Sequence, residues 1–75
     1  MSFAENLREI RQAKGMSQAE FTLYLNKLGV NITQPTIANY ELSRRMPHSK
    51  TLFALSSALG VDADELFNGK QRGKK

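Results

Sequence analysis

The sequence predicts an all-α fold, a compact bundle of five short helices in one domain. Within the first 67 residues, apolar side chains recur at intervals of three and four, which is the spacing of one helix face. Serine followed three residues later by glutamate occurs twice, and this pair is a signature of a helix start. No segment shows the alternation expected of a strand, and 75 residues provide for a single hydrophobic core.

The first helix is expected over residues 3–14. Ser2 and Glu5 have the spacing of a capping box, in which each side chain accepts a hydrogen bond from the backbone N–H of the other residue. Gly15 can adopt the left-handed conformation that ends a helix, and Met16 can supply the apolar contact that accompanies it. The buried stripe of this helix is expected to consist of Phe3, Leu7 and Ile10.

The second helix is expected over residues 17–28. Ser17 and Glu20 form another pair with capping-box spacing at its start. Its buried stripe is expected to consist of Phe21, Leu25 and Leu28. Gly29 and Asn31 mark a break, and a connection follows to residue 33.

The third helix is expected over residues 34–42. Either Thr33 or Gln34 caps it, because Pro35 disfavours helical angles in the residue before it and fits a first turn. Its inward residues are expected to be Ile37 and Tyr40. Its outward residues Gln34, Pro35, Ala38 and Asn39 are small or uncharged, whereas a solvated helix face normally carries Lys and Glu. This composition indicates a surface that presses against another molecule.

Residues 43–47 are expected to form a loop, and residues 49–59 a fourth helix that ends at Gly60. Asp62 and Glu65 have the spacing to cap a last short helix. That helix carries Leu66 and Phe67. The residues assigned to the core are Leu7, Ile10, Phe21, Leu25, Ile37, Leu52, Leu55, Leu59, Val61 and Leu66.

Charge is distributed unevenly along the chain. The net charge of +4 equals the charge of the tail, residues 68–75, which is expected to be a disordered basic tail or a linker. Residues 1–67, the expected domain, carry seven basic and seven acidic residues. Three basic residues nevertheless stand together after the third helix: Arg44, Arg45 and Lys50. They form either a phosphate-binding patch or an ordinary solvated loop.

Composition excludes several function classes. The chain has no cysteine and one histidine, His48, so neither a metal site nor a cofactor is expected. His48 is interpreted as a helix-start or phosphate-facing residue. No apolar run approaches the roughly 18 residues of a membrane span, and the N-terminus lacks the pattern of a signal peptide. No acid–base pair or nucleophile–histidine set indicates an enzyme. A cytoplasmic protein without a membrane partner is expected.

Four stretches follow one another in a recognisable order. They read LREIRQAKGMSQAEF (7–21), PTIANYE (35–41), TLFALSSALGV (51–61) and DADELF (62–67). In this order they resemble the lambdoid phage repressor and Cro family of helix-turn-helix proteins, also called the XRE family. The resemblance implies a lambda-repressor-like fold whose second and third helices form the helix-turn-helix. The chain departs from the family pattern at Thr22, Pro35 and residues 42–43. It also has several additional residues between Ser17-Gln18 and the third helix, which lengthen either the second helix or the turn.

The resemblance implies that the third helix reads base edges in the major groove of DNA. The implied base readers are Gln34, Pro35, Ala38 and Asn39. A carboxamide such as that of Gln34 can accept a hydrogen bond from adenine N6 and donate one to N7, while Pro35 and Ala38 can pack on a thymine methyl group. For Asn39, an ordinary exposed position is an equally good interpretation.

The resemblance also implies contacts that position the domain without reading sequence. The implied phosphate-contacting residues are Gln18, Thr36, Arg44, Arg45, Lys27, Asn31 and Thr33. Arg11 and Glu41 are implied to form a structural ion pair between the first and third helices. Met46 and Phe67 are implied as possible contacts of a homodimer, which would bind a near-palindromic site.

Two function classes therefore remain, with double-stranded DNA or a protein as the partner. The first is a sequence-specific DNA-binding transcriptional regulator, in particular a repressor. The second is a protein-interaction module of the antitoxin or coactivator kind that uses the same fold. DNA binding through several phosphates weakens steeply with salt, whereas a helix-groove protein contact need not.

Overall fold

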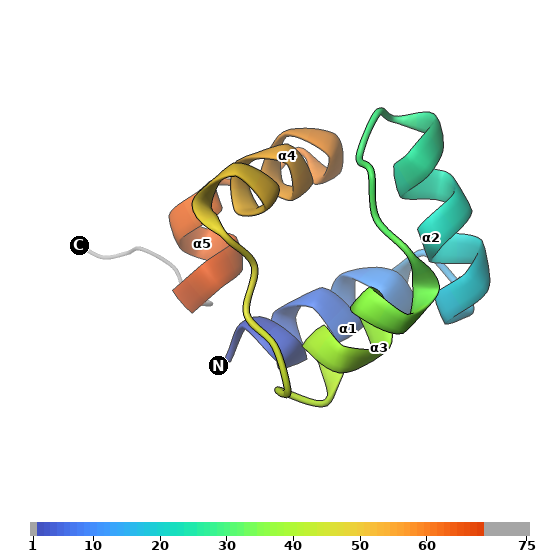
Figure 1. Cartoon of the computed structure of the whole chain (residues 1–75), viewed down its shortest axis with the longest axis horizontal. Helices are drawn as coiled ribbons and strands as arrows, with labels where there is room; N and C mark the ends of the chain where they lie inside the picture. Colours follow the sequence, from blue (N-terminus) through green and yellow to red (C-terminus); the bar gives the residue numbers. More distant parts are fainter. Residues whose placement is uncertain (1, 69–75) are drawn as a thin grey trace.

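The computed structural model describes residues 2–68 and contains, within that range, five helices and no strand. The helices are α1 (Phe3–Ala13), α2 (Gln18–Lys27), α3 (Gln34–Glu41), α4 (Ser49–Leu59) and α5 (Ala63–Asn68). Figure 1 shows α3 beside α1 and α5 beside α4. α3 also packs on α2, and α5 also packs on α1, so α1 joins the two halves of the bundle. The predicted all-α, five-helix fold is confirmed.

The first two helices begin with the predicted capping boxes. Glu5 donates its backbone N–H to Ser2 Oγ at 3.2 Å, and the Ser2 N–H donates to Glu5 Oε1 at 3.0 Å. The same exchange joins Glu20 and Ser17, at 3.1 and 2.8 Å. Of the two predicted N-caps of α3, Thr33 and Gln34, the structure has Thr33. Its side chain makes no capping hydrogen bond.

Four helices end with the same backbone pattern, in which two N–H groups beyond the helix bond back to its last turn. At the end of α2, Gly29 N–H donates to Asn26 O at 3.0 Å and Val30 N–H donates to Leu25 O at 2.9 Å. This pattern is a Schellman motif and requires a residue in the left-handed conformation. The residues that supply it are Gly15, Gly29, Ser43 and Gly60.

Five boundaries differ slightly from the prediction, and two of them are those of α2, which spans Gln18–Lys27 rather than residues 17–28 because Ser17 is its N-cap and Leu28 its C-cap. α1 ends at Ala13 and α3 at Glu41, each one residue early, because the next residue is the C-cap that leads into the left-handed turn. α5 extends to Asn68, which was assigned to the tail. The side-chain Nδ2 of Asn68 donates to Asp64 Oδ1 one turn earlier at 2.8 Å. Residues 69–75, the remainder of the predicted tail, lie outside the described residues.

The core contains ten buried apolar side chains drawn from all five helices and the α2–α3 connection. They are Phe3, Leu7, Phe21, Leu25, Val30, Ile32, Ile37, Tyr40, Leu55 and Leu66. Four predicted core residues are only partly buried and pack against this cluster from outside: Ile10, Leu52, Leu59 and Val61. Ile37 and Tyr40 of α3 belong to this cluster, so the helix rests on the core and its opposite face is presented on a rigid base.

The prediction for Leu28 is wrong, because its side chain remains 49% exposed. The apolar spacing of α2 continues in the sequence beyond the point where the helix ends. After Leu28 the chain turns at Gly29, and Val30 enters the core in its place, with only 4% exposure. Val30 and Ile32 were not predicted as core residues, since two alternating apolar residues in a short connection carry no helical period.

Ser43 adopts φ +60°, which L-residues other than Asn and Asp rarely tolerate. Replacing Ser43 by Gly removes the steric cost at the end of α3. We expect Ser43→Gly to stabilise the domain by about 1 kcal/mol, which raises the melting temperature by roughly 4 °C, as measured by circular dichroism. Ser57→Gly is the matched control, because Ser57 is exposed inside α4, and it should lower the melting temperature. A lower melting temperature for Ser43→Gly would contradict the strain argument.

Candidate nucleic-acid interface

The solvent-facing surface of α3 includes the four residues predicted to read bases. Gln34 and Pro35 are exposed, and Ala38 and Asn39 are partly exposed. They lie four residues apart in two pairs, so they share one face of the helix. Ile37, Tyr40 and Glu41 occupy the opposite face and are buried. The structure therefore brings the four residues together on the outer side of α3.

The Glu41 carboxylate holds the C-terminal end of α3 against α1 and α2. Arg11 donates from Nε to Oε2 at 2.8 Å and from Nη2 to Oε1 at 2.9 Å, and these two bonds form a bidentate ion pair. Gln18 at the start of α2 donates from Nε2 to Oε1 at 3.1 Å. Arg11 also donates from Nη1 to the Met16 carbonyl at 2.9 Å, and Arg8 donates to the Glu41 carbonyl at 3.3 Å. Three segments thus meet at one carboxylate.

Burial alone would raise the pKa of Glu41. The hydrogen bonds from Arg11 and Gln18 and the positive charges of Arg11 and Arg8 act in the opposite direction and lower the pKa below its usual value. The hydrogen bond to Glu41 correspondingly raises the pKa of Arg11. The carboxylate side chain is only 6% exposed and that of Arg11 14%, so the pair is largely shielded from water.

The residues predicted to contact phosphates lie on three segments. Gln18 stands at the N-terminal end of α2, and its side-chain amide is already engaged by Glu41. Lys27, Asn31 and Thr33 are exposed at the end of α2 and in the connection, and the Thr33 hydroxyl lies 3.0 Å from that of Thr36 on α3. The third segment is the loop after α3, where Arg44 and Arg45 are exposed; Lys50, also exposed, is the second residue of α4.

Sequence reasoning missed the residue that organises the connection. Asn26 is near the end of α2, and its side-chain Nδ2 donates to Val30 O and to Ile32 O, each at 2.9 Å. The only signal in the sequence was that Asn26 stands four residues before Val30. A spacing of four is common on exposed helix faces, so it does not single out Asn26.

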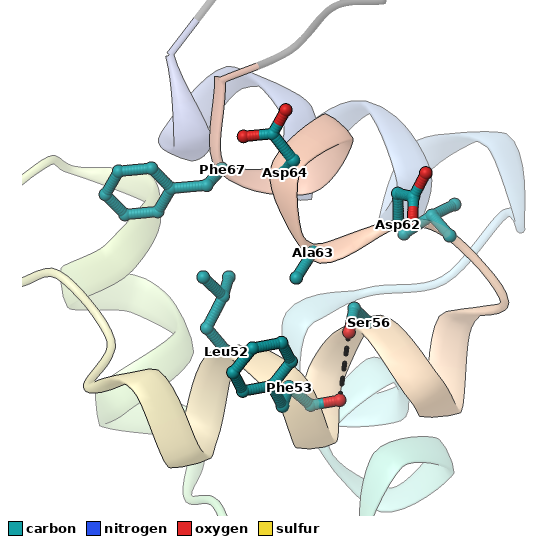
Figure 2. A pocket seen from close by; sticks show the side chains of 8 residues that line it. Leu52, Phe53, Ser56, Asp62, Ala63, Asp64 and Phe67 are labelled. Carbon is teal, nitrogen blue, oxygen red and sulfur yellow. Dashed lines mark hydrogen bonds between the residues drawn. The ribbon is translucent and has the colours of Figure 1, made fainter.

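The two residues implied as dimer contacts occupy different environments. Met46 is 52% exposed in the loop before α4. Phe67 is partly buried, and its ring centroid lies 6.2 Å from that of Phe3. Phe67 also lines a groove of about 570 Å³ between α4 and α5. Figure 2 shows Leu52 and Phe53 of α4 facing Phe67 across this groove. Phe53, which was not singled out from the sequence, is 63% exposed.

Residues 2–68 contain no group of three or more His, Cys, Asp or Glu side chains arranged to hold a metal ion. None of the helices within this range is both long and apolar enough to cross a membrane. His48 is the N-cap of α4 and makes no capping bond with its side chain.

Comparisons with known proteins agree with this geometry. The family model described as Helix-turn-helix matches residues 7–66. Among curated proteins of Bacillus subtilis (strain 168), the uncharacterized HTH-type transcriptional regulator YqaE is 39% identical over 72 residues, which cover 96% of this chain and 58% of the relative. The SPbeta prophage-derived uncharacterized HTH-type transcriptional regulator YonR is 37% identical over 67 residues, covering 89% and 57%.

The HTH-type transcriptional regulator ImmR of the same organism is 36% identical over 75 residues, covering 100% of this chain and 55% of the relative. The chain therefore spans little more than half the length of these curated relatives. No solved structure matches the chain.

Glu41→Ala should destabilise the domain strongly. The substitution leaves the Arg11 guanidinium in a shielded position without its partner, and we expect a loss of roughly 3 kcal/mol in the free energy of unfolding, measured by urea denaturation. Glu9→Ala removes an exposed acid from α1 and serves as the control, with little expected change. Equal unfolding midpoints for the two variants would show that the ion pair does not support the fold.

The lowered pKa of Glu41 also predicts a pH dependence. In the unfolded chain this carboxyl titrates near its ordinary pKa of about 4.3, so its contribution to stability is present above that pH and is lost as pH falls through the lower folded-state pKa. We expect the melting temperatures of the native protein and of Glu41→Gln to differ most near pH 7 and to converge toward pH 3. A difference in melting temperature that stays constant from pH 7 to pH 3 would show that ionisation of Glu41 does not contribute to stability.

Proposed function

The chain belongs to the Helix-turn-helix family, and we therefore propose that it is the DNA-binding part of a transcriptional regulator. The observation that carries the proposal is the outer face of α3, where Gln34, Pro35, Ala38 and Asn39 form an uncharged surface on a helix held rigidly from behind. Three relatives that carry the name of HTH-type transcriptional regulators support it. Membership in this family also agrees with a protein that is not an enzyme.

In the proposed complex, α3 lies in the major groove with its N-terminal end toward the bases. The Gln34 carboxamide is free of intramolecular partners among the described side-chain hydrogen bonds, so it can make the paired donor and acceptor contact with adenine. Asn39 lies further along the same face and can contact a second base pair in the same way. Pro35 and Ala38 provide apolar atoms for a thymine methyl group.

Contacts to the phosphates would hold this helix in register. Arg44 and Arg45 lie in the loop after α3 and would supply positive charge at its C-terminal end. Lys27, Asn31 and Thr33 supply polar groups at the other end of the helix. Thr36 shares a hydroxyl contact with Thr33, and the free N–H groups at the start of α2, beside Gln18, suit an anion.

We further propose that the regulator is a repressor that binds as a homodimer in the cytoplasm. Two copies would place their α3 helices about one turn of DNA apart on a near-palindromic operator. The exposed Met46 and the apolar groove that includes Phe67 and Phe53 are the surfaces that favour a contact between copies. The same groove is the observation that supports the second candidate function, a protein-interaction module.

Selection of binding duplexes from a random library tests the proposal. We expect the native protein to enrich a near-palindromic site, and Gln34→Ala to weaken binding to it by roughly 1–3 kcal/mol while relaxing the preference at one base pair. Gln12→Ala removes the same side chain from an exposed position on α1 and should leave binding unchanged.

Two results would count against this function. If no duplex is enriched and the residual binding disappears with salt, the interaction is only electrostatic and the protein-interaction function is favoured. If Gln34→Ala and Gln12→Ala behave alike on an enriched duplex, α3 does not read bases through Gln34.

A further inference from the structure

The α2–α3 connection is longer than the resemblance to relatives leads one to expect, yet it is tightly anchored. It runs from the C-cap Leu28 to the N-cap Thr33. Val30 and Ile32 point inward and are 4% and 7% exposed, while Asn31 between them is exposed. Val30 N–H closes the end of α2 by donating to Leu25 O at 2.9 Å. The connection therefore follows a single path over the core.

Two buried residues of the connection have carbonyl groups that a helix or sheet would normally satisfy. Among residues 2–68, no backbone N–H donates to Val30 O or to Ile32 O. The side-chain amide of Asn26 donates to both, at 2.9 Å each. An amide nitrogen carries two hydrogens, so these two bonds use its whole donor capacity. One side chain of α2 thus fixes the carbonyls on either side of Asn31.

α2 consequently holds α3 by a polar contact at each end. Gln18, the first residue of α2, bonds to Glu41, the last residue of α3. Asn26, near the other end of α2, bonds to Ile32, the residue before the N-cap of α3. Gln18 and Asn26 are eight positions apart in the helix, about 12 Å along its axis. A helix held at one end can pivot, whereas a helix held at both ends has a fixed angle.

We infer that Asn26 is a positioning residue for DNA reading, which sets the angle at which α3 presents Gln34. The inference rests on the proposed function, because the angle has a consequence only if α3 reads bases. Asn26 itself needs no contact with DNA. It acts through Ile32 and Thr33 on the first turn of α3, where Gln34 is located.

The test measures specificity rather than stability. The readout is the ratio of affinities for the duplex enriched by the native protein and for a scrambled duplex of the same length and composition. Asn26→Ala removes both hydrogen bonds without adding charge, and we expect the ratio to fall about tenfold, comparable to losing one base contact. The loss should come from weaker binding to the enriched duplex, with binding to the scrambled duplex unchanged.

Asn6→Ala is the matched control. Asn6 Nδ2 donates to Leu66 O at 2.8 Å and joins α1 to α5, away from the reading helix. Asn6→Ala therefore also loses an amide-to-carbonyl hydrogen bond and the stability that depends on it. We nevertheless expect its affinity ratio to equal that of the native protein. Both variants are measured at a temperature where circular dichroism shows them folded. If Asn26→Ala unfolds there, Asn26→Ser, which keeps one donor, takes its place with a smaller expected fall.

The outcomes separate this inference from the proposed function. A native protein that enriches no duplex overturns both. A native protein that enriches a duplex, with an Asn26 variant whose ratio stays within twofold of the native ratio, overturns the inference and leaves the proposed function standing. A fall in the ratio for the Asn26 variant alone, with the Asn6 control unchanged, supports the positioning role.

Discussion

The arrangement of the first three helices depends on one buried carboxylate. A charge taken out of water is costly unless every part of it is satisfied, and Glu41 meets this requirement only because Arg11 and Gln18 converge on it. Since these groups come from α1, α2 and α3, the charge is satisfied in one relative arrangement of the helices and in few others. The interaction therefore specifies geometry as well as contributing stability, and it does so directly behind the proposed reading face.

α3 divides its residues between two tasks. Ile37, Tyr40 and Glu41 face the core, and none of the four outer residues contributes to it. Folding thus makes few demands on the identity of the outer residues, apart from Pro35 in the first turn. Such a division separates the residues that build the scaffold from those that face a ligand.

Local signals made the helices predictable, and tertiary contacts explain what was missed. The two capping boxes located the starts of the first two helices to within one residue, and the resemblance to the XRE family is confirmed by the family match. The placement of Gln34 and Asn39 on an outer face followed from the same periodicity. The bond from Gln18 to Glu41 joins residues 23 positions apart, and the role of Asn26 depends on a path of the connection that no periodicity encodes. Leu28 was wrongly assigned to the buried stripe because the apolar spacing continues in the sequence beyond the end of α2.

The helix boundaries have a consequence for how the chain folds. α1 and α2 carry complete start signals within four residues, and α1, α2, α3 and α4 carry stop signals within six. α1 and α2 therefore carry both their start and their stop signals in their own neighbourhood, whereas α3 and α4 carry only the stop signal. Proteins dominated by such short-range interactions cross their folding barrier in microseconds to milliseconds. Helices of 6 to 11 residues are marginal in isolation, however, so these local signals stabilise them only together with docking around the core and the Glu41 carboxylate.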